Sequence, residues 1–147
     1  AITQGDPVGD MVQQAIAHGI GIYTAHTNFD QVQDGTADLL AQVLNLQNSE
    51  PVVPTQPGLG YGRVGDLTPA ISLAELLNLI QAKLLPPRLI YSPTADLGQT
   101  VDRLAVLGGS GASFMAAVAK TGAQAYLTSD CKFHQFQEGR DRNLVLI

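Results

Sequence analysis

The feature that most constrains the fold is an alternation of helical and strand-like patterns along nearly the whole chain. Apolar residues recur with helical spacing in some segments, and short apolar runs stand between them. Helices are predicted at residues 10–18, 36–46, 72–84, 110–120 and 133–139, and strands at 19–25, 88–92, 103–107, 123–128 and 143–147. Strands that alternate with helices are typical of a layered α/β fold, in which helices pack on a sheet.

Two local signals refine this prediction. Ser72 and Glu75 have the spacing of a capping box, which favours a helix start after Ser72, and the Pro86-Pro87 pair favours its end. The segment 48–62 is rich in proline and glycine, the residues that most often interrupt regular structure. We therefore expect a linker or a surface excursion between two packed parts in that segment.

Composition excludes several classes of protein. The chain has 147 residues and is 45% hydrophobic, which is too apolar for a disordered chain. It contains no run of about 20 apolar residues, so no membrane span is predicted. With 8 Lys+Arg against 13 Asp+Glu, its net charge of −5 disfavours a nucleic-acid partner. A single cysteine excludes an internal disulfide and is typical of a reducing, cytoplasmic compartment.

The charge content and the last residues are unusual for a small protein. Charged residues make up only 14% of the chain, compared with about 25% in a typical soluble domain. The segment from Leu144 to Ile147 has the pattern of a buried strand, whereas terminal tails are usually polar. From these features we expect a part of a larger protein, or a chain that packs extensively on partners.

A cluster of polar residues, His26-Thr27-Asn28-Phe29-Asp30, directly follows the first predicted strand. Proteins of the α/β class place their sites at such strand ends. On a helix, His26 and Asp30 would share one face, and imidazole and carboxylate together suit a divalent transition metal. The residues alone leave a second interpretation open, in which Asn28 and Asp30 form a turn or a helix cap and His26 is structural.

A similar cluster, Thr128 to His134, follows a later predicted strand, and in it Asp130 and His134 are again four residues apart. Two such clusters at strand ends can converge on one cleft. The alternative is that Ser129 or Asp130 caps the short helix and that His134 lies on its surface. Cys131 is either a soft metal ligand or a small buried apolar residue.

Two further segments have patterns associated with anion binding. Gly108 to Gly111 lie between a strand and a helix, where backbone N–H groups bind anions, although the segment matches neither a P-loop nor a complete dinucleotide motif. Arg63, in the segment Gly62 to Leu67, can clamp a phosphate or a carboxylate. A tight turn and an exposed turn arginine are the structural alternatives.

Taken in order, these segments resemble the signature segments of one family, the NIF-three-like family, also called GTP cyclohydrolase 1 type 2 homologues. The resemblance rests on Tyr23 to Asp30, Gly35 to Leu40, Gly62 to Leu67, Gly109 to Gly111 and Tyr126 to His134, and the His-Thr-Asn-x-Asp segment is its most specific part. It implies a layered α/β/α fold of the NIF-three-like type, incomplete in this chain. Residues 1–28 would then be the end of a first α/β domain, and residues 29–147 most of a second.

The resemblance also implies a dinuclear metal protein and a homo-oligomer, commonly a hexameric ring. Asp30 would be a metal ligand bridging two divalent ions per subunit (Zn, Fe, Mn or similar), with His26 and Asn28 beside the site. His26 and His134 are the candidate catalytic residues, the latter for proton transfer or substrate contact. The family's other ligands, a His pair and a His…Glu pair, are absent from the sequence and would lie before Ala1 and after Ile147. Ser129 and Cys131 also depart from the family pattern.

Three functions are compatible with these patterns. The first is a dinuclear metal-dependent hydrolase of the cyclohydrolase type, acting on an unknown small-molecule substrate. The second is a non-catalytic metal-binding assembly or regulatory protein, which the low charge content also suits. The third is a nucleotide-binding module that uses the Gly-rich turn, and it has the least support.

Overall fold

A five-stranded mixed sheet forms the centre of the computed structural model, which describes residues 2–147. Its strands lie in the order β1-β4-β5-β6-β7, with β1 (Gln47–Glu50), β4 (Arg63–Ser72), β5 (Thr100–Val106), β6 (Ala125–Leu127) and β7 (Val145–Leu146). Strands β1, β4 and β5 pair antiparallel, whereas β5, β6 and β7 pair parallel. The parallel strands therefore end at the same edge of the sheet.

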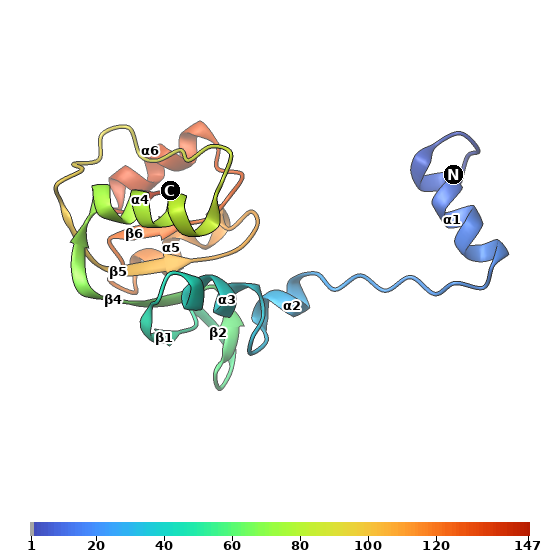
Figure 1. Cartoon of the computed structure of the whole chain (residues 1–147), viewed down its shortest axis with the longest axis horizontal. Coiled ribbons are helices and arrows are strands. Elements are labelled where there is room, and N and C mark those ends of the chain that lie inside the picture. Colours follow the sequence, from blue (N-terminus) through green and yellow to red (C-terminus); the bar gives the residue numbers. More distant parts are fainter. Residues whose placement is uncertain (1) are drawn as a thin grey trace.

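Helices cover both faces of this sheet (Figure 1). Helices α3 (Thr36–Val43) and α4 (Leu73–Leu84) pack on one face, over a core that includes Leu76, Ile80 and Leu104. The other face carries the short 3-10 helix η1 (Ala112–Phe114), α5 (Met115–Ala119) and α6 (Phe133–Asp141), with Met115 and Tyr126 in the core. The predicted layered α/β/α architecture is thus confirmed.

The predicted start of the long helix is also confirmed. The hydroxyl of Ser72 accepts from the backbone N–H of Glu75, and the Glu75 carboxylate accepts from the backbone N–H of Ser72 at 2.8 Å. The Ser72 hydroxyl, which also donates to the Glu75 carboxylate at 2.6 Å, and then the Ser72 backbone N–H hold the pKa of Glu75 below its usual range. The predicted helix at 110–120 is shorter than expected, because the 3-10 turn η1 occupies its first part.

The segment 48–62 does form a surface excursion, but it consists of regular strands rather than irregular chain. This segment contains β1 and a two-stranded hairpin of β2 (Val53–Gln56) and β3 (Leu59–Tyr61). The prolines are tolerated because Pro51 falls between two strands and Pro54 lies in a ribbon of two strands only. Gly60, at φ +154, approaches the backbone of Val53 so closely that a Cβ would lie 2.2 Å from its carbonyl oxygen.

The predicted strand at 88–92 is also absent, although its last residue does pair with the sheet. Ser92 donates its backbone N–H to the Leu146 carbonyl at 2.9 Å, and its hydroxyl accepts from the Leu146 N–H at 3.0 Å. One residue thus satisfies the outer edge of β7, and the remainder of the segment runs as irregular chain. Two hydrogen bonds at a single residue, one of them to its side chain, do not form the backbone ladder of a β-strand.

The N-terminal segment lies apart from the sheet (Figure 1). It consists of helix α1 (Pro7–Ala17), capped by the carboxylate of Asp6, and an extended stretch that leads to α2 (Thr27–Gln31). The predicted buried strand at 19–25 is wrong for this chain, because no strand within residues 2–147 pairs with the stretch and Tyr23 is 81% exposed. Ala1, the first residue of the expected 1–28 unit, lies outside the described residues. None of the helices of residues 2–147 has the length and apolarity to cross a bilayer.

Candidate functional site

The first polar cluster forms the start of the short helix α2. His26 is the residue before the helix, and its backbone N–H donates to the Asn28 side chain at 2.8 Å. Asn28 in turn donates to the hydroxyl of Tyr23 at 2.9 Å. These contacts confirm the turn-forming role of Asn28, one of the two interpretations left open by the sequence.

Asp30 lies in the first turn of α2 and is half-buried. Its carboxylate takes part in none of the hydrogen bonds or ion pairs among residues 2–147, unlike the carboxylates of Asp38, Asp66 and Glu75. An oxygen ligand without another partner suits a divalent ion. The described residues contain no group of three or more His, Cys, Asp or Glu that would complete such a site. Asp30 therefore fits one position in a metal site, and this part of the protein supplies no further cluster of ligands.

Arg63 is neither an exposed turn residue nor a free anion clamp. Only 3% of it is exposed, at the start of β4. Its Nε donates to the Asp38 carboxylate, and its Nη1 donates to the carbonyls of Gly60 and Gly62, each at 2.8 Å. Arg63 thus does clamp a carboxylate, but that carboxylate is an internal one, 25 residues away along the chain.

The second polar cluster lines a cavity of about 370 Å³ at the edge where the parallel strands end. The cavity is bounded by the turn after β5, the segment after β6, the end of β7 and the C-terminal half of α4. Its polar lining comes from Arg88, Thr128, Ser129 and Asp130, and most of the rest is apolar. Asp130 adopts a left-handed backbone, at φ +57, which is uncommon for a residue other than glycine.

The Gly-rich turn beside this cavity is held by side chains of β6 and of the segment after it. The Thr128 hydroxyl donates to the Gly109 carbonyl and accepts from the Gly111 N–H, both at 2.9 Å. Tyr126 donates its hydroxyl to the Gly111 carbonyl at 2.8 Å, and burial raises the pKa of this phenol well above its ordinary value. A Cβ on Gly111 would lie 2.4 Å from that hydroxyl. The geometry supports the tight-turn interpretation, because the Gly111 N–H is already used.

His134 and Cys131 have the surroundings expected from their structural alternatives, except that the helix has another capping residue. His134 is exposed on α6, which neither Ser129 nor Asp130 caps, because Lys132 precedes the helix and donates its N–H to the Gln135 side chain at 2.6 Å. Burial, and then the charge of Asp130, raise the pKa of the Cys131 thiol. A raised pKa disfavours the thiolate, which is the form that binds metals and acts as a nucleophile.

The structure brings together only some of the predicted site residues. The Gly-rich turn and the Thr128 cluster meet at the cavity, as two strand-end segments are expected to. His26 and Asp30 do not line that cavity, and α2 and α6 lie in different parts of the body (Figure 1). Asp38 was not among the predicted residues. Its place in the first turn of α3 is a local signal for helix capping, but nothing local identifies Arg63 as its partner.

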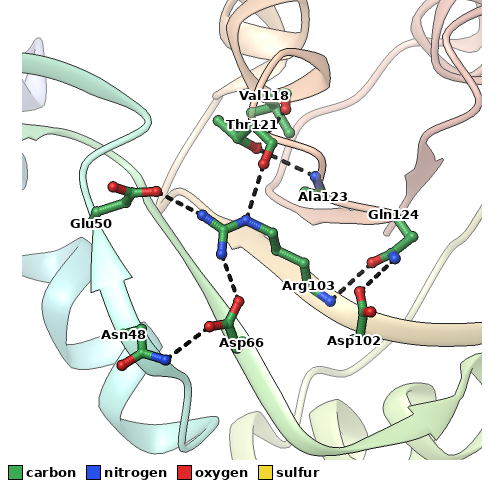
Figure 2. A network of polar contacts seen from close by, with 9 residues as sticks. All are labelled: Asn48, Glu50, Asp66, Asp102, Arg103, Val118, Thr121, Ala123 and Gln124. Carbon is green, nitrogen blue, oxygen red and sulfur yellow. Dashed lines mark hydrogen bonds and ion pairs between the residues drawn. The ribbon is translucent and has the colours of Figure 1, made fainter.

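A second arginine, Arg103, organises the network of polar contacts in Figure 2. Its guanidinium donates to Asp66 and Glu50, each at 2.6 Å, and to the Thr121 carbonyl at 3.0 Å. Gln124 accepts from the Arg103 backbone N–H at 2.9 Å and donates to Asp102 at 2.5 Å. Since each guanidinium nitrogen of Arg103 has a protein partner, we assign this network a structural role.

Comparisons with known proteins match the whole chain to a single protein family. Residues 1–147 match the family model described as Duf34/NIF3 (NGG1p interacting factor 3). A "GTP cyclohydrolase 1 type 2 homolog" from Nostoc sp. is 65% identical over 147 residues, and one from Clostridium perfringens is 30% identical over 148. These alignments cover 100% and 99% of the chain and 56% of each relative, so the chain spans little more than half of their length.

The fold has a counterpart among solved structures. The crystal structure of a Bacillus cereus protein related to NIF3 superposes with a TM-score of 0.90 at 19% sequence identity, covering 99% of this chain and 66% of the other. At that identity the similarity concerns the fold alone. It extends the confirmation of the layered α/β/α architecture to an experimentally determined relative.

Proposed function

Because the chain belongs to the Duf34/NIF3 family, we propose that it is part of a dinuclear metal-dependent hydrolase in which Asp30 is a metal ligand. The observation that carries the proposal is the Asp30 carboxylate, which is half-buried in the family's most specific segment and has no other partner among residues 2–147. A carboxylate that no protein donor occupies is available to coordinate a cation. The remaining ligands of this metal site would come from other parts of the intact protein.

Each candidate residue then has a distinct part in the reaction. When bound, two divalent ions supply Lewis-acid polarisation of the substrate and lower the pKa of a coordinated water. Asp30 provides negative charge and an oxygen ligand for them. His26, directly before α2, and His134, exposed on α6, are the groups proposed to exchange protons with the substrate. The substrate is a small molecule, and the name of the Nostoc relative makes GTP the first one to test.

The proposal includes the arrangement of the intact protein. We assign residues 1–28 to the end of a first α/β domain and residues 29–147 to most of a second. The exposed apolar side chains of the N-terminal segment support this assignment, because residues such as Ile20, Ile22 and Tyr23 are normally covered. A homo-oligomer, such as the hexamer expected from the family resemblance, and a cytoplasmic location complete the proposal.

A non-catalytic metal-binding assembly or regulatory protein is the second candidate. The same exposed apolar side chains favour it, since they indicate contacts with further protein surface rather than with a small molecule. Under this proposal the metal would have a structural role. The two candidates share Asp30 as a ligand and differ only in turnover.

Metal analysis of the intact protein tests the shared premise. We expect about two transition-metal ions per subunit, and we expect Asp30→Asn to lower that content because the amide carries no charge. Asp34→Asn is the matched control. Asp34 is a nearby exposed carboxylate at φ +59, a conformation that asparagine adopts readily. Equal metal content in wild type and Asp30→Asn would contradict the proposal.

Turnover separates the two candidates. The metal-loaded protein is incubated with GTP and a panel of other purine nucleotides, and product formation is followed by chromatography. The hydrolase predicts turnover that is lost in Asp30→Asn and retained in Asp34→Asn. Protein that binds two ions and consumes none of the panel favours the assembly role.

A further inference from the structure

We propose that Arg63 and Asp38 form a clamp that positions helix α2, and with it the Asp30 carboxylate, against the body of the protein. This inference rests on the proposed role of Asp30. Neither clamp residue is proposed to touch a metal or a substrate. They act through the turn between α2 and α3.

Arg63 is anchored in the sheet. Arg63 begins β4, an inner strand of the sheet with β1 on one side and β5 on the other. Its Nη1 also binds the carbonyls of Gly60 and Gly62. The guanidinium is therefore fixed to the sheet and to the corner between β3 and β4, and its Nε is aimed at α3. A planar guanidinium held at three points has little freedom left.

Asp38 forms the bridge. One carboxylate oxygen, Oδ1, accepts from Arg63, and the other, Oδ2, accepts from the backbone N–H of Asp34 at 2.8 Å. Asp34 precedes α3 and has a left-handed backbone. A single side chain thus ties the turn before α3 to the first residue of β4. An acidic residue in the first turn of a helix is also favoured by the helix dipole.

This turn is connected to α2. Gly35 donates its N–H to the Val32 carbonyl at 3.1 Å, which closes the turn after α2. The same glycine lies so close to α2 that a Cβ would be 2.1 Å from the Phe29 carbonyl oxygen. Phe29 is the residue next to Asp30. The clamp therefore reaches the backbone of α2 with no flexible side chain between them.

The clamp is shielded from water. The Arg63 and Asp38 side chains are only 3% and 19% exposed, so water does not readily replace either partner. Within the described residues, Nη2 of Arg63 is buried and has no hydrogen-bond partner. A buried arginine that is incompletely satisfied depends strongly on its single carboxylate. Loss of this contact is expected to free the turn, and α2 with it.

The test compares Arg63→Met, Arg63→Lys and Arg103→Met in the intact protein, each shown by circular dichroism to be folded. Hydrogen exchange is measured by mass spectrometry over residues 27–36. We expect hydrogen exchange at least ~10-fold faster in Arg63→Met. A smaller increase is expected in Arg63→Lys, because lysine keeps the charge but lacks the planar group that donates to several partners at once. Arg103→Met, which removes an arginine from the other network, is the matched control and is expected to leave these residues unchanged.

Titration with Co²⁺ provides the second readout, because its visible spectrum reports ligand geometry. Stripped Arg63→Met protein should bind Co²⁺ about 10-fold to 100-fold more weakly, as is typical when a residue supporting a ligand is lost, with partial rescue in Arg63→Lys. Unchanged exchange at 27–36 in Arg63→Met would overturn the clamp. Faster exchange with unchanged Co²⁺ affinity would overturn the positioning role.

Failure of the clamp and failure of the proposed function give different results. If Asp30→Asn leaves Co²⁺ binding intact, the proposed metal role of Asp30 fails, whatever the exchange data show. Should Arg63→Met not fold, Asp38→Asn replaces it, since asparagine retains one acceptor of the two. The same regional increase in exchange, smaller in size, is expected there, and its absence would overturn the clamp.

Discussion

Arg63 and Arg103 lie on the same pair of strands, yet their surroundings differ in almost every respect. In the β4–β5 ladder, Arg63 is opposite Val106 and Arg103 is opposite Asp66. The two positions differ by three residue numbers along each strand. Because successive side chains point to alternate faces, Arg63 and Arg103 lie on opposite faces of the sheet. Arg63 meets α3, whereas Arg103 meets the end of α5 and the edge strand β1.

Each guanidinium has three protein partners, but the buried arginine leaves one nitrogen unused and the partly exposed one does not. All three nitrogens of the Arg103 guanidinium donate to protein oxygens, and its side chain is 24% exposed (Figure 2). Arg63 leaves one nitrogen without a partner among the described residues, although it is nearly inaccessible. We expect burial, rather than the number of hydrogen bonds, to decide how much each arginine contributes to the free energy of unfolding. The reason is that water can replace a lost partner only at the surface.

The largest expected effect is that of Arg63→Met. It removes the charge while keeping most of the apolar volume, and it leaves Asp38 with a poorly solvated carboxylate. Breaking a buried ion pair in this way should lower the free energy of unfolding by ~3 kcal/mol. Urea denaturation at pH 7 measures the change. Arg142→Met, which removes an exposed pair with Glu138, is the control, and an equal loss there would refute the distinction drawn from burial.

A double-mutant cycle on Arg63 and Asp38 should reveal strong coupling. The single variants Arg63→Met and Asp38→Asn are each expected to lose most of what the double variant loses, giving an interaction free energy of ~2 kcal/mol. The same cycle on Arg103 and Asp66 is expected to give clearly weaker coupling, because both are accessible and Arg103 keeps other partners. Similar coupling in both pairs would mean that burial does not separate them.

Arg103→Met is expected to lower stability by only ~1 kcal/mol, in line with partly exposed ion pairs. Its loss should shrink further in 1 M NaCl, since salt screens accessible charges. The loss caused by Arg63→Met should change little with salt. Denaturation curves at two ionic strengths measure both, and a salt-independent Arg103 effect would contradict the assignment of its network to the accessible surface.

The smallest expected effect is a change in acid stability. Hydrogen bonds from Asn48, and then from Arg103, hold the pKa of Asp66 below its usual range. A carboxylate with a lowered folded-state pKa stabilises the protein above its unfolded-state pKa of about 4 and loses that contribution as the pH falls through the folded value. Wild type should therefore lose more stability than Asp66→Asn between about pH 4 and pH 2. Thermal melts over that range provide the measurement, and parallel curves would contradict it.

The elements of the fold were predictable wherever a local pattern decided them. The capping box at Ser72 and Glu75 acts within one helical turn, and the apolar period of α4 lies in its own residues. The strands near Pro54 were missed because proline and glycine indicate turns, whereas here a hairpin of two strands tolerates them. The expected strand at 19–25 failed for another reason, since a strand needs a partner and none of residues 2–147 provides one.

The candidate site likewise contains features that a local sequence pattern reveals and features that it does not. The segment from His26 to Asp30 could be recognised from its residues, and Asn28 forms the local contacts that its type favours. The sequence pattern indicated that Arg63 can clamp an anion, but it did not indicate that this anion is Asp38. That pairing depends on α3 crossing the start of β4, which no local pattern encodes.

The sequence by itself therefore determined the alternating elements from β5 onward, the start of α4 and the identity of the polar clusters. Each of these depends on interactions between residues a few positions apart. The tertiary structure alone decided which arginine is buried, which carboxylate it holds and which clusters share the cavity. Those outcomes follow from strand register and layer packing, since a register that sends Arg63 to one face of the sheet sends Arg103 to the other.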